Sequence, residues 1–149
     1  MSTFYIGAPI DTSSSDVSEP YDKLAAVIKA ASVKLNHPEY VIFNPFSAYR
    51  HAHTAVGAGL DYVVNMNNCA LDSAGIAAFI VNDQPSIGVP YEIARRAESG
   101  KPTFVWYRGS KSPGIYLKHM LKGSNSVLTV TNEEKVVDEL AAFIKKNLI

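Results

Sequence analysis

Apolar residues along the chain follow two patterns, short continuous runs and longer stretches with helical spacing. Ile76 to Val81 is a continuous apolar run, which is typical of a strand buried on both faces of a sheet. Apolar residues three and four positions apart predict an amphipathic helix over residues 20–36; they are Leu24, Val27, Ile28, Ala31 and Leu35. The two patterns alternate along the chain, so strands and helices are expected to alternate too.

Five strands and five helices are predicted in this way. The strands are expected at Phe4 to Ala8, Tyr40 to Phe43, Ile76 to Val81, Thr103 to Tyr107 and Val127 to Thr131. The helices are expected over residues 20–36, within 58–73, at Gly88 to Ser99, at Pro113 to Lys122 and after Asn132, with Ser18 and Asn132 capping the first and the last. Strand followed by helix, five times, predicts an α/β fold. We expect a single doubly wound, flavodoxin- or Rossmann-like domain over residues 1–149, with helices on both faces of a five-stranded parallel sheet.

The composition is that of a globular protein and argues against several classes of function. Of 149 residues, 47% are hydrophobic, and 14 basic residues balance 14 acidic ones. A zero net charge argues against coating of a nucleic-acid polymer. The single cysteine cannot form an internal disulfide, and no apolar run reaches the roughly 18 residues that span a bilayer. The N-terminus has no signal-peptide pattern, so we expect a cytoplasmic protein without a membrane partner.

The ligand site is expected beyond the carboxyl ends of the strands, where α/β sheets bind small molecules. The loop after Val81 reads Gln-Pro-Ser-Ile-Gly-Val-Pro-Tyr-Glu over residues 84–92. Ser86 and Gly88 stand at the start of a helix, where free backbone N–H groups favour an anion. Glu92 follows one turn into that helix. A capping role for Ser86 and a helix-dipole role for Glu92 are simpler alternatives, which the spacing alone leaves open.

The run from Gln84 to Ile93 continues through residues 94–102 and, with the opening segment Phe4 to Ile10, resembles the nucleoside 2-deoxyribosyltransferase family. Within that family the chain is most similar to the nucleoside 5′-monophosphate N-glycosidases. The resemblance continues through Gly114 to Gly123 and into the last helix, whereas residues 37–62 match poorly.

The resemblance implies a covalent mechanism centred on Glu92. In this family a carboxylate attacks the anomeric carbon, displaces the base and forms a glycosyl-enzyme ester, which water hydrolyses. Glu92 corresponds to that nucleophile, and Tyr5 to a tyrosine that orients it; a core aromatic is the alternative for Tyr5. No metal or organic cofactor is implied. The expected activity is hydrolysis of the N-glycosidic bond of a nucleoside 5′-monophosphate, which releases free base and (deoxy)ribose 5-phosphate.

Several residues are candidates for binding the phosphate. Relatives that act on free nucleosides carry an acidic residue at the position of Ser86, which would repel a phosphate, whereas the Ser86 hydroxyl and the Gly88 amide would bind one. Gly7 and Ser13, at the end of the first strand and in the loop after it, are further candidates. Lys118 corresponds to a phosphate contact that a neighbouring subunit supplies. The resemblance therefore implies a homodimer or higher homo-oligomer with a shared active site.

One position departs from the family pattern. The aspartate that assists the departing base corresponds to Asn67, with Asn68 as the alternative one residue further on. An asparagine can hydrogen-bond a base but cannot protonate it. Either the base needs no acid from this position, or Asp83 or Asp61 supplies it, or catalysis is weak or absent. Asp72 is a poor substitute, because five residues along a helix turn it to another face.

Other interpretations stay open. A transferase that exchanges bases uses the same chemistry, and a nucleotide-binding module would follow from the loss of the aspartate. A doubly wound electron-transfer or receiver domain is a third possibility. His51 and His53 form an H-x-H pair that could contact a metal or a base, although a surface loop is commoner. Cys69 is expected to be a small buried residue. The sequence identifies neither the base nor the sugar.

Overall fold

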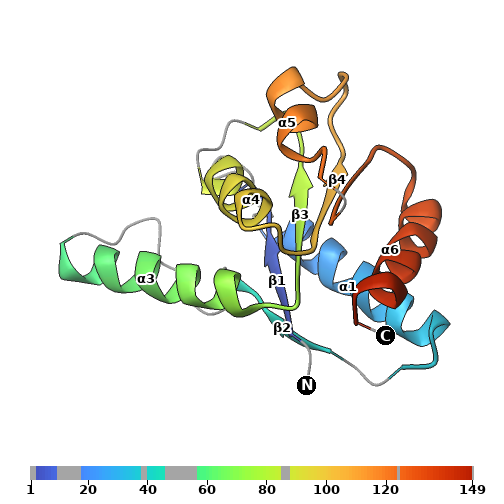
Figure 1. Cartoon of the computed structure of the whole chain (residues 1–149), viewed down its shortest axis with the longest axis horizontal. Coiled ribbons are helices and arrows are strands. Elements are labelled where there is room, and N and C mark those ends of the chain that lie inside the picture. Colours follow the sequence, from blue (N-terminus) through green and yellow to red (C-terminus); the bar gives the residue numbers. More distant parts are fainter. Residues whose placement is uncertain are drawn as a thin grey trace.

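A five-stranded parallel sheet lies at the centre of the described chain (Figure 1). Its strands are β1 (Thr3–Gly7), β2 (Val41–Phe43), β3 (Ile76–Val81), β4 (Thr103–Tyr107) and β5 (Ser126–Thr129), in the order β2-β1-β3-β4-β5. The helices are α1 (Glu19–Lys34), α3 (Ala58–Ser73), α4 (Gly88–Glu98), α5 (Ile115–Met120) and α6 (Glu133–Leu148). The structure is a computed structural model, and it describes residues 3–9, 18–37, 40–45, 57–84, 88–123 and 125–148.

The predicted doubly wound fold is confirmed. Helices α1 and α6 cover one face of the sheet, and α3, α4 and α5 pack on the other. Strands β1 and β3 are neighbours, yet the chain leaves Gly7 toward α1 and leaves Val81 toward α4, which lie on opposite faces. Such a switch point, at the carboxyl ends of two adjacent strands, is where α/β proteins bind ligands.

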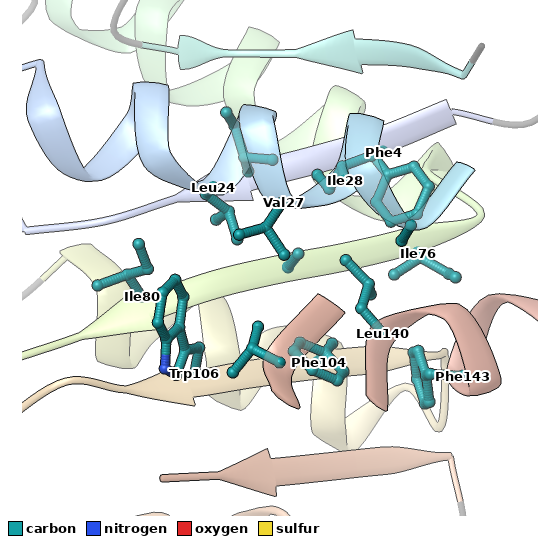
Figure 2. Close-up of a cluster of buried hydrophobic side chains, with 14 of the residues drawn as sticks. Phe4, Leu24, Val27, Ile28, Ile76, Ile80, Phe104, Trp106, Leu140 and Phe143 are labelled. Carbon is teal, nitrogen blue, oxygen red and sulfur yellow. The ribbon is translucent and has the colours of Figure 1, made fainter. Parts of the chain in front are cut away.

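Successive strand residues alternate between two hydrophobic cores, as the pleat of a strand requires. Figure 2 shows the first core, between the sheet and helices α1 and α6, with Phe4 near Ile28 and Phe104 near Leu140. The second core lies on the other face and joins Tyr5 of β1 to Ile93 of α4. Phe4 and Tyr5 thus point to opposite faces, and the Tyr5 side chain faces the side that α4 covers.

Helix α3 packs on the sheet through its last turns and otherwise extends away from the body of the fold (Figure 1). Leu71 is fully buried, whereas Tyr62 and Met66 are 59% and 40% exposed. The prediction that Cys69 is buried is wrong, since its side chain is exposed. The reason is that the second core reaches this part of α3 only on the side of Ala70 and Leu71.

The predicted cap is confirmed at α6 and wrong at α1. Asn132 Oδ1 accepts a hydrogen bond from the backbone N–H of Lys135 at 3.0 Å and so caps α6. Ser18 does precede α1, but its hydroxyl donates to Asp22 Oδ2 at 3.1 Å and makes no capping bond to the helix backbone. The Asp22 carboxylate, one turn into the helix, therefore accepts a hydrogen bond from the Ser18 hydroxyl, which would otherwise accept one from a backbone N–H.

Candidate functional site

The side chains of Tyr5 and Glu92 approach each other at the carboxyl end of β1. Tyr5 has no exposed surface and packs against the rings of Phe43 and Phe79, with centroids 5.8 and 6.2 Å away. Glu92 lies in the second turn of α4 and faces the same region. The pleat of β1 directs Tyr5 to this face, and the position of Glu92 one turn after the helix start sets its carboxylate beside the strand end.

One oxygen of the Glu92 carboxyl group, Oε2, is buried next to the hydroxyl group of Tyr5. Neither Glu92 Oε2 nor Tyr5 Oη meets hydrogen-bond geometry with any partner in the described chain, although the two groups are close enough to shift each other's pKa. Burial raises the pKa of Glu92 from 4.5 to about 7, and the Tyr5 hydroxyl opposes that rise. Burial, and after it the charge of Glu92, raises the pKa of Tyr5 far above its ordinary value. Glu92 is therefore a poorly solvated acid that titrates near neutral pH.

Two glycines leave the backbone open beside this carboxyl group. A Cβ atom on Gly7 would lie 3.7 Å from Glu92 Oε2 and only 2.7 Å from the ring of Phe79, so no larger residue fits there without a shift. A Cβ atom on Gly88, at the start of α4, would lie 3.9 Å from Glu92 Oε1, which is an ordinary contact. The end of β1 and the beginning of α4 therefore both border the Glu92 carboxyl group.

Asn67 lies on the helix that packs beside α4. Its Oδ1 is buried and has no hydrogen-bond partner in the described chain. The neighbouring Asn68 donates through Nδ2 to Tyr91 Oη at 3.5 Å, and Tyr91 precedes Glu92 on α4. This contact sets the Asn67 turn of α3 beside the Glu92 turn of α4, so a third unsatisfied polar group lies on the same side of the sheet.

The acidic side chains that could replace the family aspartate have other partners or are exposed. Asp83 accepts hydrogen bonds from the backbone N–H and the hydroxyl of Ser110, at 3.0 and 2.7 Å, and these bonds lower its pKa. Asp72 forms a two-point ion pair with Arg95, which lowers its pKa as well. Asp61 is exposed in the first turn of α3. A lowered pKa does not suit an acid that must carry a proton near neutral pH.

Lys118 does not lie with the groups around Glu92. It is exposed on α5, and its Nζ donates to Ser112 Oγ at 3.3 Å. No residue of α5 is buried, and Ile115 and Tyr116 on the same helix are 76% and 80% exposed. Among the other predicted site residues, Ser86 and Ser13 lie outside the described residues, as do His51 and His53.

The sequence patterns did not predict a second tyrosine near Glu92. Tyr21, in the first turns of α1, is 5% exposed and donates its hydroxyl to the carbonyl oxygen of Ala8 at 2.8 Å. Burial, together with the nearby charge of Glu92, raises the pKa of Tyr21 to about 12, against the opposing effect of the Ala8 bond. A tyrosine at the polar start of an amphipathic helix is the only signal in the sequence that could have indicated this contact.

An apolar cavity of about 290 Å³ lies close by, between α4 and α5 at the carboxyl ends of β3 and β4. Its walls include Val81, Pro90, Ile93, Tyr107, Tyr116 and Leu117. In the ranges that the structure describes, no three His, Cys, Asp or Glu side chains lie together as metal ligands would. None of the described helices is long and apolar enough to cross a bilayer.

Known structures share this fold. A 2-deoxyribosyltransferase from Bacillus psychrosaccharolyticus matches with a TM-score of 0.68 at 13% identity, over 92% of this chain and 91% of that one. The CMP N-glycosidase of Clostridium botulinum matches with a TM-score of 0.64 at 11% identity, over 95% of this chain and 98% of that one. An oxidoreductase from Corynebacterium diphtheriae matches with a TM-score of 0.55 at 15% identity, over 98% of both chains.

These likenesses establish the fold, and they agree with the resemblance of residues 84–93. The first two structures are named for the two activities of the family that this segment resembles. The third carries a different activity on the same fold, so the fold alone does not decide the reaction. No protein-family model matches the chain, and no curated protein matches its sequence.

Proposed function

We propose that this protein hydrolyses the N-glycosidic bond of a nucleoside 5′-monophosphate and that Glu92 is its nucleophile. The observation that carries the proposal is the Glu92 carboxyl group, whose buried Oε2 has no well-formed hydrogen bond in the described chain and which borders the glycines at the end of β1 and the start of α4. A carboxylate that folding leaves unpartnered at a ligand-binding edge is available to a substrate. The resemblance to the glycosidases and transferases names the substrate class.

The reaction has two steps. Ionised Glu92 attacks the anomeric carbon, a C–O ester bond forms, and the C–N bond breaks with its electron pair going to the base. Water then attacks the anomeric carbon and releases the sugar 5-phosphate and free Glu92. Burial favours this chemistry because a poorly solvated carboxylate is a stronger nucleophile, and a pKa of about 7 keeps a large fraction ionised near neutral pH. Tyr5 orients the carboxylate.

The base departs beside Asn67 in this proposal. The amide of Asn67 can hydrogen-bond an edge of the base but has no acidic proton to give. Asp83 is occupied by Ser110 and has a lowered pKa, so the leaving base takes its proton from solvent. Slow turnover is the consequence, since a general acid usually contributes about 10²-fold or more.

The 5′-phosphate is assigned to the beginning of α4. Gly88 offers a backbone N–H at a helix N-terminus, where the dipole favours an anion, and its missing side chain lets a ligand approach. Ser86, Gly7 and Ser13 complete the proposed phosphate site. Lys118 of a second copy adds a positive charge from outside, which agrees with its exposed position on α5. A homodimer or higher homo-oligomer is thus part of the proposal.

The test is to incubate the protein with a panel of nucleoside 5′-monophosphates and to measure free base by chromatography. Glu92→Gln is expected to reduce base release by about 10³-fold or more, because no ester can form. Glu98→Gln is the matched control, since Glu98 lies exposed at the other end of α4. No base release by the wild type, or full activity of Glu92→Gln, would contradict the proposal.

Two other functions give different results in the same assay. A base-exchanging transferase would convert an added second base into a new nucleoside or nucleotide. A nucleotide-binding module, which the Asn67 substitution favours, would bind a nucleotide tightly in calorimetry without turnover. Mass spectrometry of quenched reactions would locate the sugar ester on the peptide that contains Glu92 if the covalent mechanism holds.

A further inference from the structure

Helix α1 lies on the opposite face of the sheet from Glu92, yet one of its side chains reaches the carboxyl end of β1. Tyr21 is almost fully buried, and its hydroxyl donates to the Ala8 carbonyl oxygen at 2.8 Å. Ala8 is itself 2% exposed and directly follows the strand. A buried carbonyl group just beyond a strand needs a donor, and Tyr21 supplies it.

The bond from Tyr21 acts on the part of β1 that borders Glu92. Gly7 precedes Ala8, and its backbone is packed so closely that an added Cβ would overlap the ring of Phe79 and stand 3.7 Å from Glu92 Oε2. A small displacement of residues 7 and 8 would therefore change the surroundings of the Glu92 carboxyl group. The Tyr21 hydroxyl is the side-chain group that ties this backbone to α1.

Electrostatics gives an independent sign that the three side chains share one region. Burial is the main cause of the raised pKa values of Tyr21 and Tyr5, and the charge of Glu92 adds to both, although the three residues belong to α1, β1 and α4. In the described chain, these two phenols are the titratable groups that interact with Glu92 in this way. The proton of Tyr21 is engaged with Ala8, so it is not directed to the carboxylate.

We propose that Tyr21 is a positioning residue: its hydroxyl holds the end of β1, and with it Gly7 and Tyr5, against the Glu92 carboxyl group. The catalytic role of Tyr21 rests on the proposed function of Glu92. Its effect on the position of the end of β1 can be measured without any activity. Loss of the hydroxyl would loosen residues 7 and 8 and admit water to Glu92, which would lower the pKa of that carboxyl group.

The experiment compares Tyr21→Phe with Tyr40→Phe. Phenylalanine keeps the ring of Tyr21 and removes only its hydroxyl. Tyr40 is a matched control because its Oη is also buried, has no hydrogen-bond partner in the described chain and lies at the other end of the sheet, where its ring contacts Phe4 with centroids 5.2 Å apart. The side-chain carboxyl carbon of Glu92 is followed by NMR during a pH titration, and kcat and KM are measured on the nucleotide that the wild type cleaves.

In Tyr21→Phe, we expect the pKa of Glu92 to fall by about one unit from its value near 7 toward 4.5. We also expect kcat to fall about tenfold while KM changes by less than about twofold, because the substrate contacts remain and the nucleophile is misplaced. Tyr40→Phe should change neither quantity. If the pKa of Glu92 is unchanged in Tyr21→Phe, the inference is overturned, whatever the activity. If the wild type releases no base, the proposed function is overturned, and the NMR titration alone still tests the positioning role of Tyr21.

Discussion

Two ionisable side chains one turn apart on helix α4, those of Arg96 and Glu92, have opposite surroundings. Arg96, near the C-terminal end, has no exposed surface and donates to the carbonyl oxygens of Leu71, Ala74 and Pro102 at 2.9 Å and to that of Gly75 at 3.4 Å. Glu92, one turn earlier, has a buried oxygen with no hydrogen bond in the described chain.

This difference distinguishes a side chain that stabilises the fold, Arg96, from one that is available to a ligand, Glu92. Arg96 donates to carbonyl groups at the end of α3 and before β3 and β4, and of these the Pro102 carbonyl also accepts from the backbone N–H of Ala77. Burial still lowers its pKa to about 10, and only its Nε is unpartnered. On the face of the sheet that α3 and α4 cover, Tyr5, Glu92 and Asn67 each have a buried polar atom without a hydrogen bond in the described chain. Such groups cost stability unless a ligand satisfies them.

The largest effect is expected on removal of the arginine. Arg96→Met removes the side-chain donor from the carbonyl groups of Leu71, Ala74 and Gly75, and we expect the free energy of unfolding to fall by about 3 kcal/mol or more. Urea unfolding measures it. Arg95→Met is the control on the next residue, where an exposed ion pair with Asp72 is lost and a smaller change is expected. Equal losses in the two variants would mean that the carbonyl contacts of Arg96 contribute no special stability.

The pH dependence of stability tests the Glu92 carboxyl group. The pKa of Glu92 is about 7 in the folded protein and 4.5 as its ordinary value, so folding favours the protonated form. Stability from this group is therefore complete below pH 4.5 and falls as the pH rises to 7, by about 3 kcal/mol in total. Glu92→Gln should lose this decline and be more stable than the wild type at pH 8. Glu98→Gln should keep the wild-type pH profile, and a profile in Glu92→Gln that also declines would contradict the assignment.

The same contrast explains which features the sequence could predict. Strand and helix order follows from local periodicity, so the sheet and the face of Tyr5 could be predicted from residues near each other in the chain. The roles of Glu92 and Tyr5 came from a resemblance to known enzymes, because periodicity carries no chemistry. The contact of Tyr21 with Ala8 and the burial of Arg96 depend on distant segments and on backbone acceptors, which no residue pattern encodes.

The predicted burial and capping of single side chains were less accurate than the predicted strands and helices, for a related reason. An apolar residue in a helix is expected to be buried only if another element covers it, and α3 extends beyond the sheet. Cys69 is exposed because the second core reaches its part of α3 only on the side of Ala70 and Leu71. The hydroxyl of Ser18 likewise found a side-chain partner in Asp22 that competes with capping. These outcomes depend on three-dimensional neighbours, not on residue type.

A smaller effect is expected for Tyr5→Phe. The variant removes a buried hydroxyl that interacts with the Glu92 carboxyl group but makes no well-formed hydrogen bond in the described chain, so the free energy of unfolding should change by less than about 1 kcal/mol. The Tyr5 hydroxyl lowers the pKa of Glu92, so the variant should raise that pKa further and move the rise of activity to higher pH. NMR titration and a pH–rate profile measure the two shifts. Tyr40→Phe removes a comparable hydroxyl far from Glu92, and an equal shift there would refute the specific role of Tyr5.

The smallest effect concerns the loops at the carboxyl edge. Asp83, after β3, accepts from the backbone N–H and hydroxyl of Ser110, after β4, so one carboxylate joins the two loops. In Asp83→Ala we expect the Ser110 amide to exchange its hydrogen about tenfold faster or more, while the unfolding midpoint stays unchanged, because the bond orders loops and not the core.

Hydrogen-exchange NMR measures this protection. Asp138→Ala is the control, since it breaks an exposed ion pair with Lys34 between α6 and α1 and should leave the Ser110 amide unchanged. If Asp83→Ala lowered the unfolding midpoint as much as Arg96→Met, the carboxyl edge would also carry the stability of the fold. The comparison between Arg96, which stabilises the fold, and Glu92, which is available to a ligand, would then no longer hold. The unpartnered Oε2 of Glu92 would no longer support a functional role.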